Sequence, residues 1–146
     1  MTTSTSRKIL IVDDVTDSRA LLVRTLLRKF PTASFKECQE STAAVAACGS
    51  QRFDVIIAHR SVDLDGITLV RVLRKINPDV PIVMISGIDR TKQALEAGAT
   101  CFHNYDEWLR IGTVVAQLLA PGTSGSTPTP FGKTEEADSR RTQSAK

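Results

Sequence analysis

The sequence predicts an α/β protein: a doubly wound, five-stranded parallel sheet with helices on both faces. The first observation is that short apolar runs, typical of strands buried on both sides, alternate with stretches of helical periodicity through residues 8–120. The second is the number of alternations, because five strand–helix units in one short region require right-handed crossovers around a single sheet. Folds of this class place their functional side chains at the carboxyl ends of the strands.

Each strand is expected where β-branched and other apolar residues run together between turn residues. The first and third runs are the clearest, because Asp13 and Asp14 end the one and Asp54 opens the other. The second run is weaker, and the fifth is short. In chain order, the predicted strands cover residues 9–12, 33–38, 54–58, 81–85 and 99–104.

Each helix is expected to begin at a side chain that can cap its first turn and to end near a glycine, a proline or a polar tail. The predicted caps are Asp17 or Ser18, Ser41 or Thr42, Asp65, Asp89 and Asp106, and the predicted ends are Pro31, Gly49, Pro78, Gly98 and Ala120. Apolar residues recur every three or four positions on the first, third and fifth helices. These residues are Leu22, Val23, Leu26, Leu27 and Phe30, then Val70, Leu73 and Ile76, then Trp108, Leu109, Val115, Leu118 and Leu119.

Composition divides the chain of 146 residues into one domain and two termini. Residues 121–146 are rich in Ser, Thr, Pro and Gly and show no periodicity, so we expect a disordered tail. Residues 1–7 are expected to be a flexible N-terminus, and residues 8–120 the folded domain. A DNA-binding output module would need about 60 further ordered residues, which this tail does not provide.

Charge and cysteine usage exclude several classes of protein. The net charge is only +3 and the basic residues do not form a run, so we expect no nucleic-acid partner. The first residues are polar and lead into a short apolar run, which predicts neither a signal peptide nor a membrane span. Cys38, Cys48 and Cys101 are odd in number and form no CxxC pair, so a cytoplasmic protein without disulfides is expected.

Polar side chains stand where the predicted strands end. Asp13 and Asp14 follow the first strand, Ala58 and His59 close the third, and Ser86 closes the fourth. Two adjacent carboxylates are hard oxygen ligands that can hold Mg²⁺. The alternative is that they only open the loop and cap the first helix. His103, on the fifth strand, is expected to be a surface or edge side chain.

Four segments together, in this order and spacing, resemble the receiver domain of bacterial two-component response regulators over residues 8–120. They read ILIVDD, DVIIAHRSVDLDG, PIVMISG and ALEAGATCFHNYDEW. The resemblance implies a flavodoxin-like fold with strand order 2-1-3-4-5. It also implies that Asp13 and Asp14 bind Mg²⁺, that Ser86 contacts the phosphoryl group, and that Phe102 is the aromatic residue that repositions.

Two positions depart from the family pattern, and both belong to its chemistry. Counting from Asp54 puts His59 where the family has its phosphoacceptor aspartate, whereas counting back from Asp65 puts Ala58 there. Tyr105 stands where the family has a lysine. We therefore expect a degenerate receiver in which His59 fills the vacated pocket and can hydrogen-bond Asp14. Mg²⁺ binding is expected to be weak or absent, so that Asp13 and Asp14 are vestigial as a metal site.

Alternative functions follow from other residues. A displaced acceptor, Asp63 or Asp65, would make the chain an active phosphotransfer regulator, although both residues are better explained as capping and turn residues. A phosphorylated His59 is less favoured, because the site suits an oxygen nucleophile. A small-ligand domain lacks support, because GxGxxG and GxxxxGK[ST] are both absent.

The function predicted from these features is that of a stand-alone receiver protein in two-component signalling, and not of an enzyme. It is expected to escape conventional aspartyl phosphorylation and to act through protein contacts. The resemblance implies a partner surface made by the fourth helix, fifth strand and fifth helix, where Tyr105 and Trp108 either pack or contribute to the interaction. A histidine kinase and a second copy of the chain are the other partners considered.

Overall fold

A computed structural model describes residues 6–120, and the predictions made for residues 1–5 and 121–146 lie outside this range. The sheet has five parallel strands in the order β2-β1-β3-β4-β5, which confirms the fold class and the strand order. Each strand lies within two residues of its predicted bounds. The strands are β1 (Lys8–Asp13), β2 (Ser34–Cys38), β3 (Val55–Arg60), β4 (Ile82–Ser86) and β5 (Cys101–Asn104).

Helices follow each strand, as the alternation predicts. Asp65 caps the third helix by accepting a hydrogen bond from the Thr68 N–H at 2.9 Å, and Gly98 ends the fourth with a left-handed φ of 115°. The helices are α1 (Thr16–Lys29), α2 (Ser41–Ser50), α3 (Gly66–Ile76), α4 (Thr91–Ala97), the 3₁₀ helix η1 (Tyr105–Arg110) and α5 (Ile111–Leu119).

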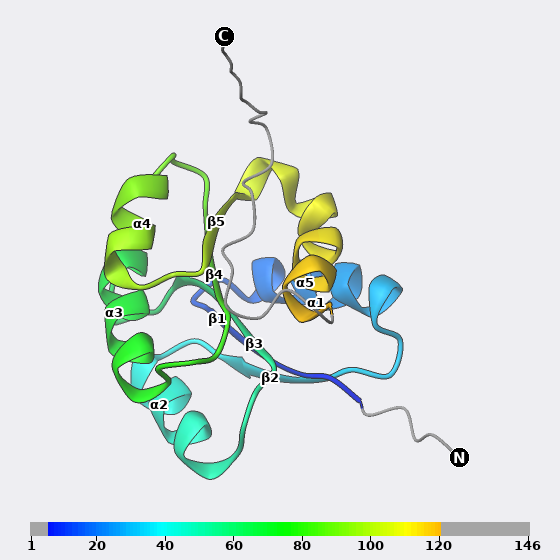
Figure 1. Cartoon of the computed structure of the whole chain (residues 1–146), viewed down its shortest axis with the longest axis horizontal. Coiled ribbons are helices and arrows are strands. Elements are labelled where there is room, and N and C mark those ends of the chain that lie inside the picture. The colour runs from blue at the N-terminus through cyan, green and yellow to red at the C-terminus, as the bar shows by residue number, and fades with distance from the viewer. Residues whose placement is uncertain (1–5, 121–146) are drawn as a thin grey trace, which may run out of the picture.

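The helices form two layers with the sheet between them: α2, α3 and α4 cover one face, and α1 and α5 cover the other (Figure 1). Alternation along the central strands builds both cores, because successive side chains point to opposite faces. Leu10 and Val12 of β1 pack towards α3, whereas Ile9 and Ile11 pack towards α1 and α5. All four side chains are completely buried. This double cover explains why β1 reads as an uninterrupted apolar run.

Several predicted helix starts are wrong by one or more residues. The N-cap of α1 is Val15, so that Asp17 and Ser18 lie in the first turn instead of capping it. Glu40 occupies the cap of α2, and Gly49 lies inside that helix, one residue before its end. The hydroxyls of Ser18 and Ser41 instead donate to Asp13 and Asp63.

The fifth helix differs most from its prediction. It was expected to run unbroken over residues 106–120, but η1 and α5 are separated by a kink at Glu107, whose φ and ψ are −106° and 35°. Leu109, predicted to anchor this helix, is 63% exposed, and Ile111, Val114 and Val115 form the buried contact instead. Leu27 and Ile76, assigned to buried faces of the first and third helices, are also exposed.

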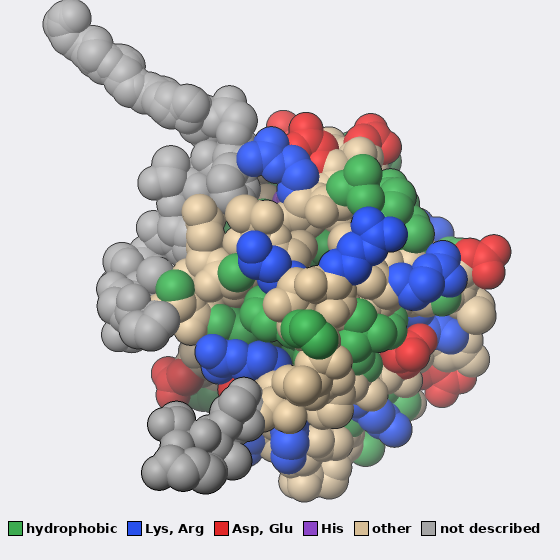
Figure 2. Space-filling view, turned by 90° about the vertical axis from the view of Figure 1, so that its right-hand side faces the viewer, with side chains coloured by type: hydrophobic (Ala, Val, Ile, Leu, Met, Phe, Trp, Pro, Cys, Tyr) green, Lys and Arg blue, Asp and Glu red, His purple; other side chains and the backbone are tan. Residues whose placement is uncertain are grey.

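No helix within residues 6–120 is both long and apolar enough to cross a membrane. On the side that carries α1 and α5, Lys and Arg side chains lie scattered among hydrophobic and other groups (Figure 2). The basic residues of that face therefore do not merge into a continuous patch of the kind that tracks a nucleic-acid backbone.

Candidate functional site

Asp13 lies at the carboxyl end of β1 and is completely buried. Its Oδ1 accepts a hydrogen bond from the Val15 N–H at 2.9 Å, and its Oδ2 accepts from the Ser18 hydroxyl and, at 3.1 Å, from His59 Nδ1. Burial alone would raise the pKa of Asp13, but these hydrogen bonds outweigh it and place the pKa below its usual value. The structure therefore holds a buried, ionised carboxylate whose two oxygens both have protein donors.

His59 reaches Asp13 because the pairing of β1 with β3 is irregular at this point. Val12 pairs with Ala58 and Asp13 pairs with Arg60, so His59 is the extra residue of a β-bulge. Ala58 is completely buried in the core beneath α3 and does not reach the site. Of the two residues that counting along the sequence left open, His59 is thus the one beside the acidic pair.

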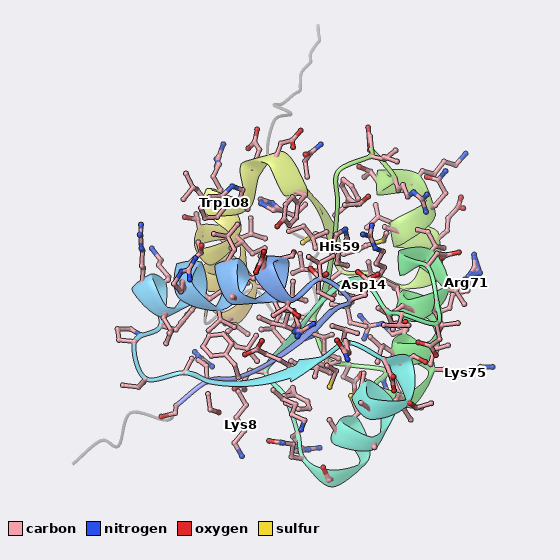
Figure 3. All side chains as sticks on the ribbon, turned by 180° about the vertical axis from the view of Figure 1, so that it is seen from behind. Lys8, Asp14, His59, Arg71, Lys75 and Trp108 are labelled. Atoms are coloured by element: carbon pink, nitrogen blue, oxygen red, sulfur yellow. The ribbon has the colours of Figure 1, made fainter. Side chains whose placement is uncertain are left out.

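Asp14 is bound by Arg60 and not by His59, so the expected hydrogen bond between His59 and Asp14 is wrong. Arg60 Nε lies 3.0 Å from one carboxylate oxygen of Asp14 and 3.1 Å from the other. Arg19 adds a hydrogen bond of 2.7 Å from its guanidinium to the Asp13 carbonyl. Figure 3 shows His59 and Asp14 close together near the end of the sheet. The bulge explains this difference from the expected pairing, because it directs His59 towards Asp13 and Arg60 towards Asp14.

Tyr105 covers the other side of His59. The two rings are stacked, with centroids 5.5 Å apart and planes inclined by 17°, within the range of favourable offset stacking. Tyr105 is the first residue of η1, directly after β5. The place where the family pattern has a lysine therefore holds an uncharged ring packed on the imidazole.

Ser86 and Phe102 lie on the neighbouring strands but do not join this group. The Ser86 hydroxyl accepts a hydrogen bond from the Ile88 N–H at 3.2 Å, which shapes the loop after β4. Phe102 is half-buried and packs against the core beneath α3 and α4. Within the described part of the chain, neither side chain hydrogen-bonds to the Asp13–His59 pair.

Asp63 and Asp65 both lie in the β3–α3 loop, and each accepts hydrogen bonds from residues at the start of a helix. Asp63 accepts from the Ser41 N–H at 3.0 Å and from the Ser41 hydroxyl, and so ties this loop to the start of α2. Asp65 caps α3 through Thr68. The bond from Thr68 lowers the pKa of Asp65, and those from Ser41 lower the pKa of Asp63 to about 2.

The Asp63–Ser41 contact predicts a specific pH dependence. The pKa of Asp63 falls from 3.8 to about 2 on folding, so its stabilising effect is full above the unfolded value and is lost as the pH falls through the folded one. We expect the free energy of unfolding, measured by urea denaturation, to decline less steeply over this interval in Asp63→Asn than in the wild type. Ser41→Ala removes the hydroxyl bond but keeps the backbone N–H bond to Asp63, so it should flatten the curve in part. Parallel curves for all three proteins would contradict this assignment.

Two other sequence predictions concern His103 and the cysteines. His103 was expected at the surface or an edge; it lies on the edge strand β5 but is only 6% exposed, and its Nε2–H donates to the Glu107 carbonyl at 2.8 Å. Burial lowers the pKa of His103. Cys38, Cys48 and Cys101 are free thiols whose pKa values are raised by burial, that of Cys101 to about 11. Such thiols are poor nucleophiles at neutral pH.

The residues at the site do not fit a magnesium ion. Mg²⁺ demands near-octahedral coordination by oxygen, through carboxylates with free lone pairs together with water. Both oxygens of Asp13 accept protein hydrogen bonds, and both oxygens of Asp14 face the Nε of Arg60. Among residues 6–120, no group of three or more His, Cys, Asp or Glu side chains is arranged to hold a metal.

Sequence reasoning missed Arg60 and Arg19 altogether and assigned Ser18 only to a helix cap. The available signal was that Arg60 immediately follows His59 at a strand end that already faced two carboxylates. Regular strand alternation would send His59 and Arg60 to opposite faces. Only the bulge brings both residues to the acidic pair, and no periodicity predicts the bulge.

Comparison with known proteins agrees with the fold. A family model described as "Response regulator receiver domain" matches residues 9–103. The "Transcriptional regulatory protein PrrA" of Mycobacterium tuberculosis is 34% identical over 121 residues, which is 80% of this chain and 48% of that protein. The chain thus spans about half the length of PrrA.

Solved structures share the architecture at low sequence identity. Chemotaxis response regulator CheY4 of Vibrio cholerae superposes with a TM-score of 0.64 at 24% identity, covering 76% of this chain and 99% of CheY4. A response regulator of Burkholderia pseudomallei, with a phosphorylated aspartic acid, a calcium ion and citrate, gives a TM-score of 0.66 at 20% identity and covers 77% of this chain and 66% of that one. At these identities the likeness shows the fold alone.

Proposed function

Because the chain belongs to the response regulator receiver domain family, whose domains act in two-component signalling, we propose that it is an atypical receiver that is not phosphorylated on a conventional aspartate and acts through protein contacts. It is a signalling module and not an enzyme. One observation carries the proposal: the side chain that faces the acidic pair from β3 is His59 and not a carboxylate.

An acyl phosphate can form only on a carboxylate oxygen. The Burkholderia relative carries its phosphoryl group on an aspartic acid, whereas β3 of this chain, VIIAHR, contains no acidic residue. Asp13 is not a substitute, because it is buried and both its oxygens are hydrogen-bonded. The first requirement of conventional receiver chemistry is therefore not met by the strand that normally supplies it.

The groups that stabilise a phosphoryl group in receiver domains also differ in this chain. Receiver domains typically bind Mg²⁺ at the phosphorylation site, yet Asp13 and Asp14 are occupied by His59 and Arg60. Tyr105 replaces an ammonium with an aromatic ring, which supplies no charge to a phosphate. We propose that Ser86 is a remnant of the phosphate pocket and that Phe102 is a remnant of the aromatic switch.

The alternative, a displaced acceptor at Asp63 or Asp65, is not favoured. Each carboxylate holds the start of a helix, Asp63 through Ser41 and Asp65 through Thr68. Their lowered pKa values show that these contacts stabilise the ionised form. Phosphorylation of either residue would break its contact at the start of a helix.

The proposed partner surface consists of α4, β5, η1 and α5. It presents exposed apolar side chains, among them Leu95 (42% exposed) on α4 and Leu109 (63% exposed) on η1. The stack of Tyr105 on His59 and the bond from His103 to the Glu107 carbonyl both fix the start of η1. The site would thereby hold this surface in one conformation without phosphorylation. The partner would be a cytoplasmic signalling protein, such as a histidine kinase or a second copy of the chain.

The decisive experiment is incubation of the purified chain with acetyl phosphate and Mg²⁺, followed by intact mass spectrometry. We expect no hydroxylamine-labile gain of one phosphoryl group in the wild type. The variant His59→Asp/Arg60→Met/Tyr105→Lys, which restores an acceptor, frees Asp14 and returns an ammonium, should acquire the label. Its labelling would also prove that the assay detects the reaction in this scaffold.

Labelling of the wild type would overturn the proposal. In that event Asp63→Asn and Asp65→Asn identify the acceptor, because the substitution that abolishes the label marks the residue that carries it. Loss of the label in His59→Gln, together with lability in acid and stability in alkali, would instead indicate a phosphohistidine.

A further inference from the structure

The two carboxylates at the end of β1 are bound by side chains of the chain itself, Asp13 by His59 and Asp14 by Arg60. We propose that Arg60 and His59 together take the place of the divalent cation, so that the site is complete and closed without a metal. This inference rests on the proposed function and specifies how the site is regulated: its state does not depend on Mg²⁺.

Burial is the first reason why Asp13 requires a permanent partner. A fully buried carboxylate loses its hydration and must be compensated by hydrogen bonds or by charge. Asp13 receives three hydrogen bonds, from Val15, Ser18 and His59, and the Arg19 guanidinium binds its carbonyl at 2.7 Å. Both oxygens of this carboxylate therefore already accept hydrogen bonds from protein donors.

Arg60 provides the positive charge for the second carboxylate. Its guanidinium is charged at every accessible pH, and its Nε lies 3.0 and 3.1 Å from the two oxygens of Asp14. One N–H thus sits between both oxygens, which is where a bidentate cation would sit. The side chain of Asp14 is 24% exposed and that of Arg60 is 49% exposed, so water screens part of the attraction between them.

Binding of Mg²⁺ would require His59 and Arg60 to release their carboxylates at the same time. The ion would have to displace His59 from Asp13 and Arg60 from Asp14, and movement of His59 would also separate its ring from Tyr105. Mg²⁺ gives up its own water reluctantly and binds firmly only where several free carboxylate oxygens converge. At the described site, the carboxylate oxygens of Asp13 and Asp14 all take part in these contacts.

Titration with Mg²⁺ and Mn²⁺ tests the inference. Affinity is measured by isothermal calorimetry, and the place of binding by Mn²⁺-induced broadening of backbone amide signals at the ends of β1 and β3. We expect the wild type to show no saturable binding at millimolar Mg²⁺ and no selective broadening there. His59→Asp/Arg60→Met, which removes both replacements and adds a third carboxylate, should bind at least about tenfold more tightly, a gain of about 1.4 kcal/mol.

Arg71→Met is the matched control, because Arg71 projects outward from α3, away from the site (Figure 3). It removes the same charge and should leave Mg²⁺ binding as weak as in the wild type. Arg60→Met alone serves if the double variant does not fold, and it should show an intermediate gain. Saturable binding by the wild type at the ends of β1 and β3 overturns the inference, as does a folded variant series with unchanged affinity.

The outcome is separable from that of the acetyl phosphate assay. If the wild type binds Mg²⁺ but takes no phosphoryl group, the inference that Arg60 and His59 replace the metal is wrong, while the proposal of an atypical receiver stands. A wild type that is phosphorylated would contradict the atypical receiver, whatever its affinity for the metal.

Discussion

Replacing Arg74 with methionine is expected to lower the free energy of unfolding by about 2 to 4 kcal/mol, because three partly buried carbonyls lose their donor at once. The half-buried Arg74 guanidinium donates to the carbonyls of Asn77 and Val80, each at 2.7 Å, and of Gly98 at 2.8 Å, and it reaches the Thr100 hydroxyl at 3.3 Å. One side chain therefore joins the end of α3 to the segments before β4 and β5. Methionine keeps the apolar stem but donates nothing.

Chemical denaturation with urea measures this loss. Arg71→Met again provides the comparison, since Arg71 is exposed on the same helix and its substitution should change stability by no more than about 0.5 kcal/mol. If the two variants are equally stable, the Arg74 hydrogen bonds contribute no more to the free energy of unfolding than the bonds to water that replace them in the unfolded chain. We also expect backbone amides around Gly98 to lose hydrogen-exchange protection in Arg74→Met.

The second large effect is expected from Gly66→Ala. A Cβ at this position would lie 2.3 Å from the His59 carbonyl oxygen and 2.7 Å from Met84 Cε. The methionine can move, but the carbonyl belongs to β3, so α3 and the end of β3 must separate. Such overpacking costs about 1 to 3 kcal/mol. Because the displaced carbonyl is that of His59, the contacts of its imidazole with Asp13 and Tyr105 should loosen as well.

Two measurements check this prediction. Urea denaturation should give the loss of stability, and NMR should show altered ring shifts for His59 and Tyr105. Gly49→Ala is the control, because a Cβ there meets nothing within 4 Å and the residue lies within α2. That change should stabilise the protein by about 0.5 to 1 kcal/mol through helix propensity. Unchanged ring shifts in Gly66→Ala would mean that β3 does not move and that α3 yields instead.

The sheet was predictable because its signal is local. The runs at 9–12 and 81–85 are apolar on both faces, and Asp65 with Gly66 marks a helix start whose cap the structure confirms. Helix ends and exposed faces were less predictable, since they depend on what the rest of the fold leaves uncovered. Leu109 fits a buried helical stripe in the sequence, yet the kink at Glu107 turns it outward.

The sequence was sufficient to locate the site but not to predict which of its residues pair with one another. Asp13, Asp14, His59 and Tyr105 were all identified, because each stands at a strand end, and the structure brings them together. Their pairing was assigned wrongly, since it depends on an irregular register between β1 and β3 that hydrophobic patterns do not encode. The burial of His103 was missed for a similar reason: its partner, the Glu107 carbonyl, becomes available only where the helix breaks.

The bulge in β3 also bears on how easily this site could change during evolution. Histidine and aspartate codons differ by a single base, so an acidic residue at position 59 is one mutation away. That mutation alone would place a third carboxylate beside Asp13 while Arg60 still held Asp14, because the bulge directs two consecutive side chains to the acidic pair. A metal-dependent acceptor would need a second substitution, at Arg60, and the single variant would carry an uncompensated buried charge. The extra residue of β3 therefore couples positions 59 and 60, so that neither substitution is sufficient alone.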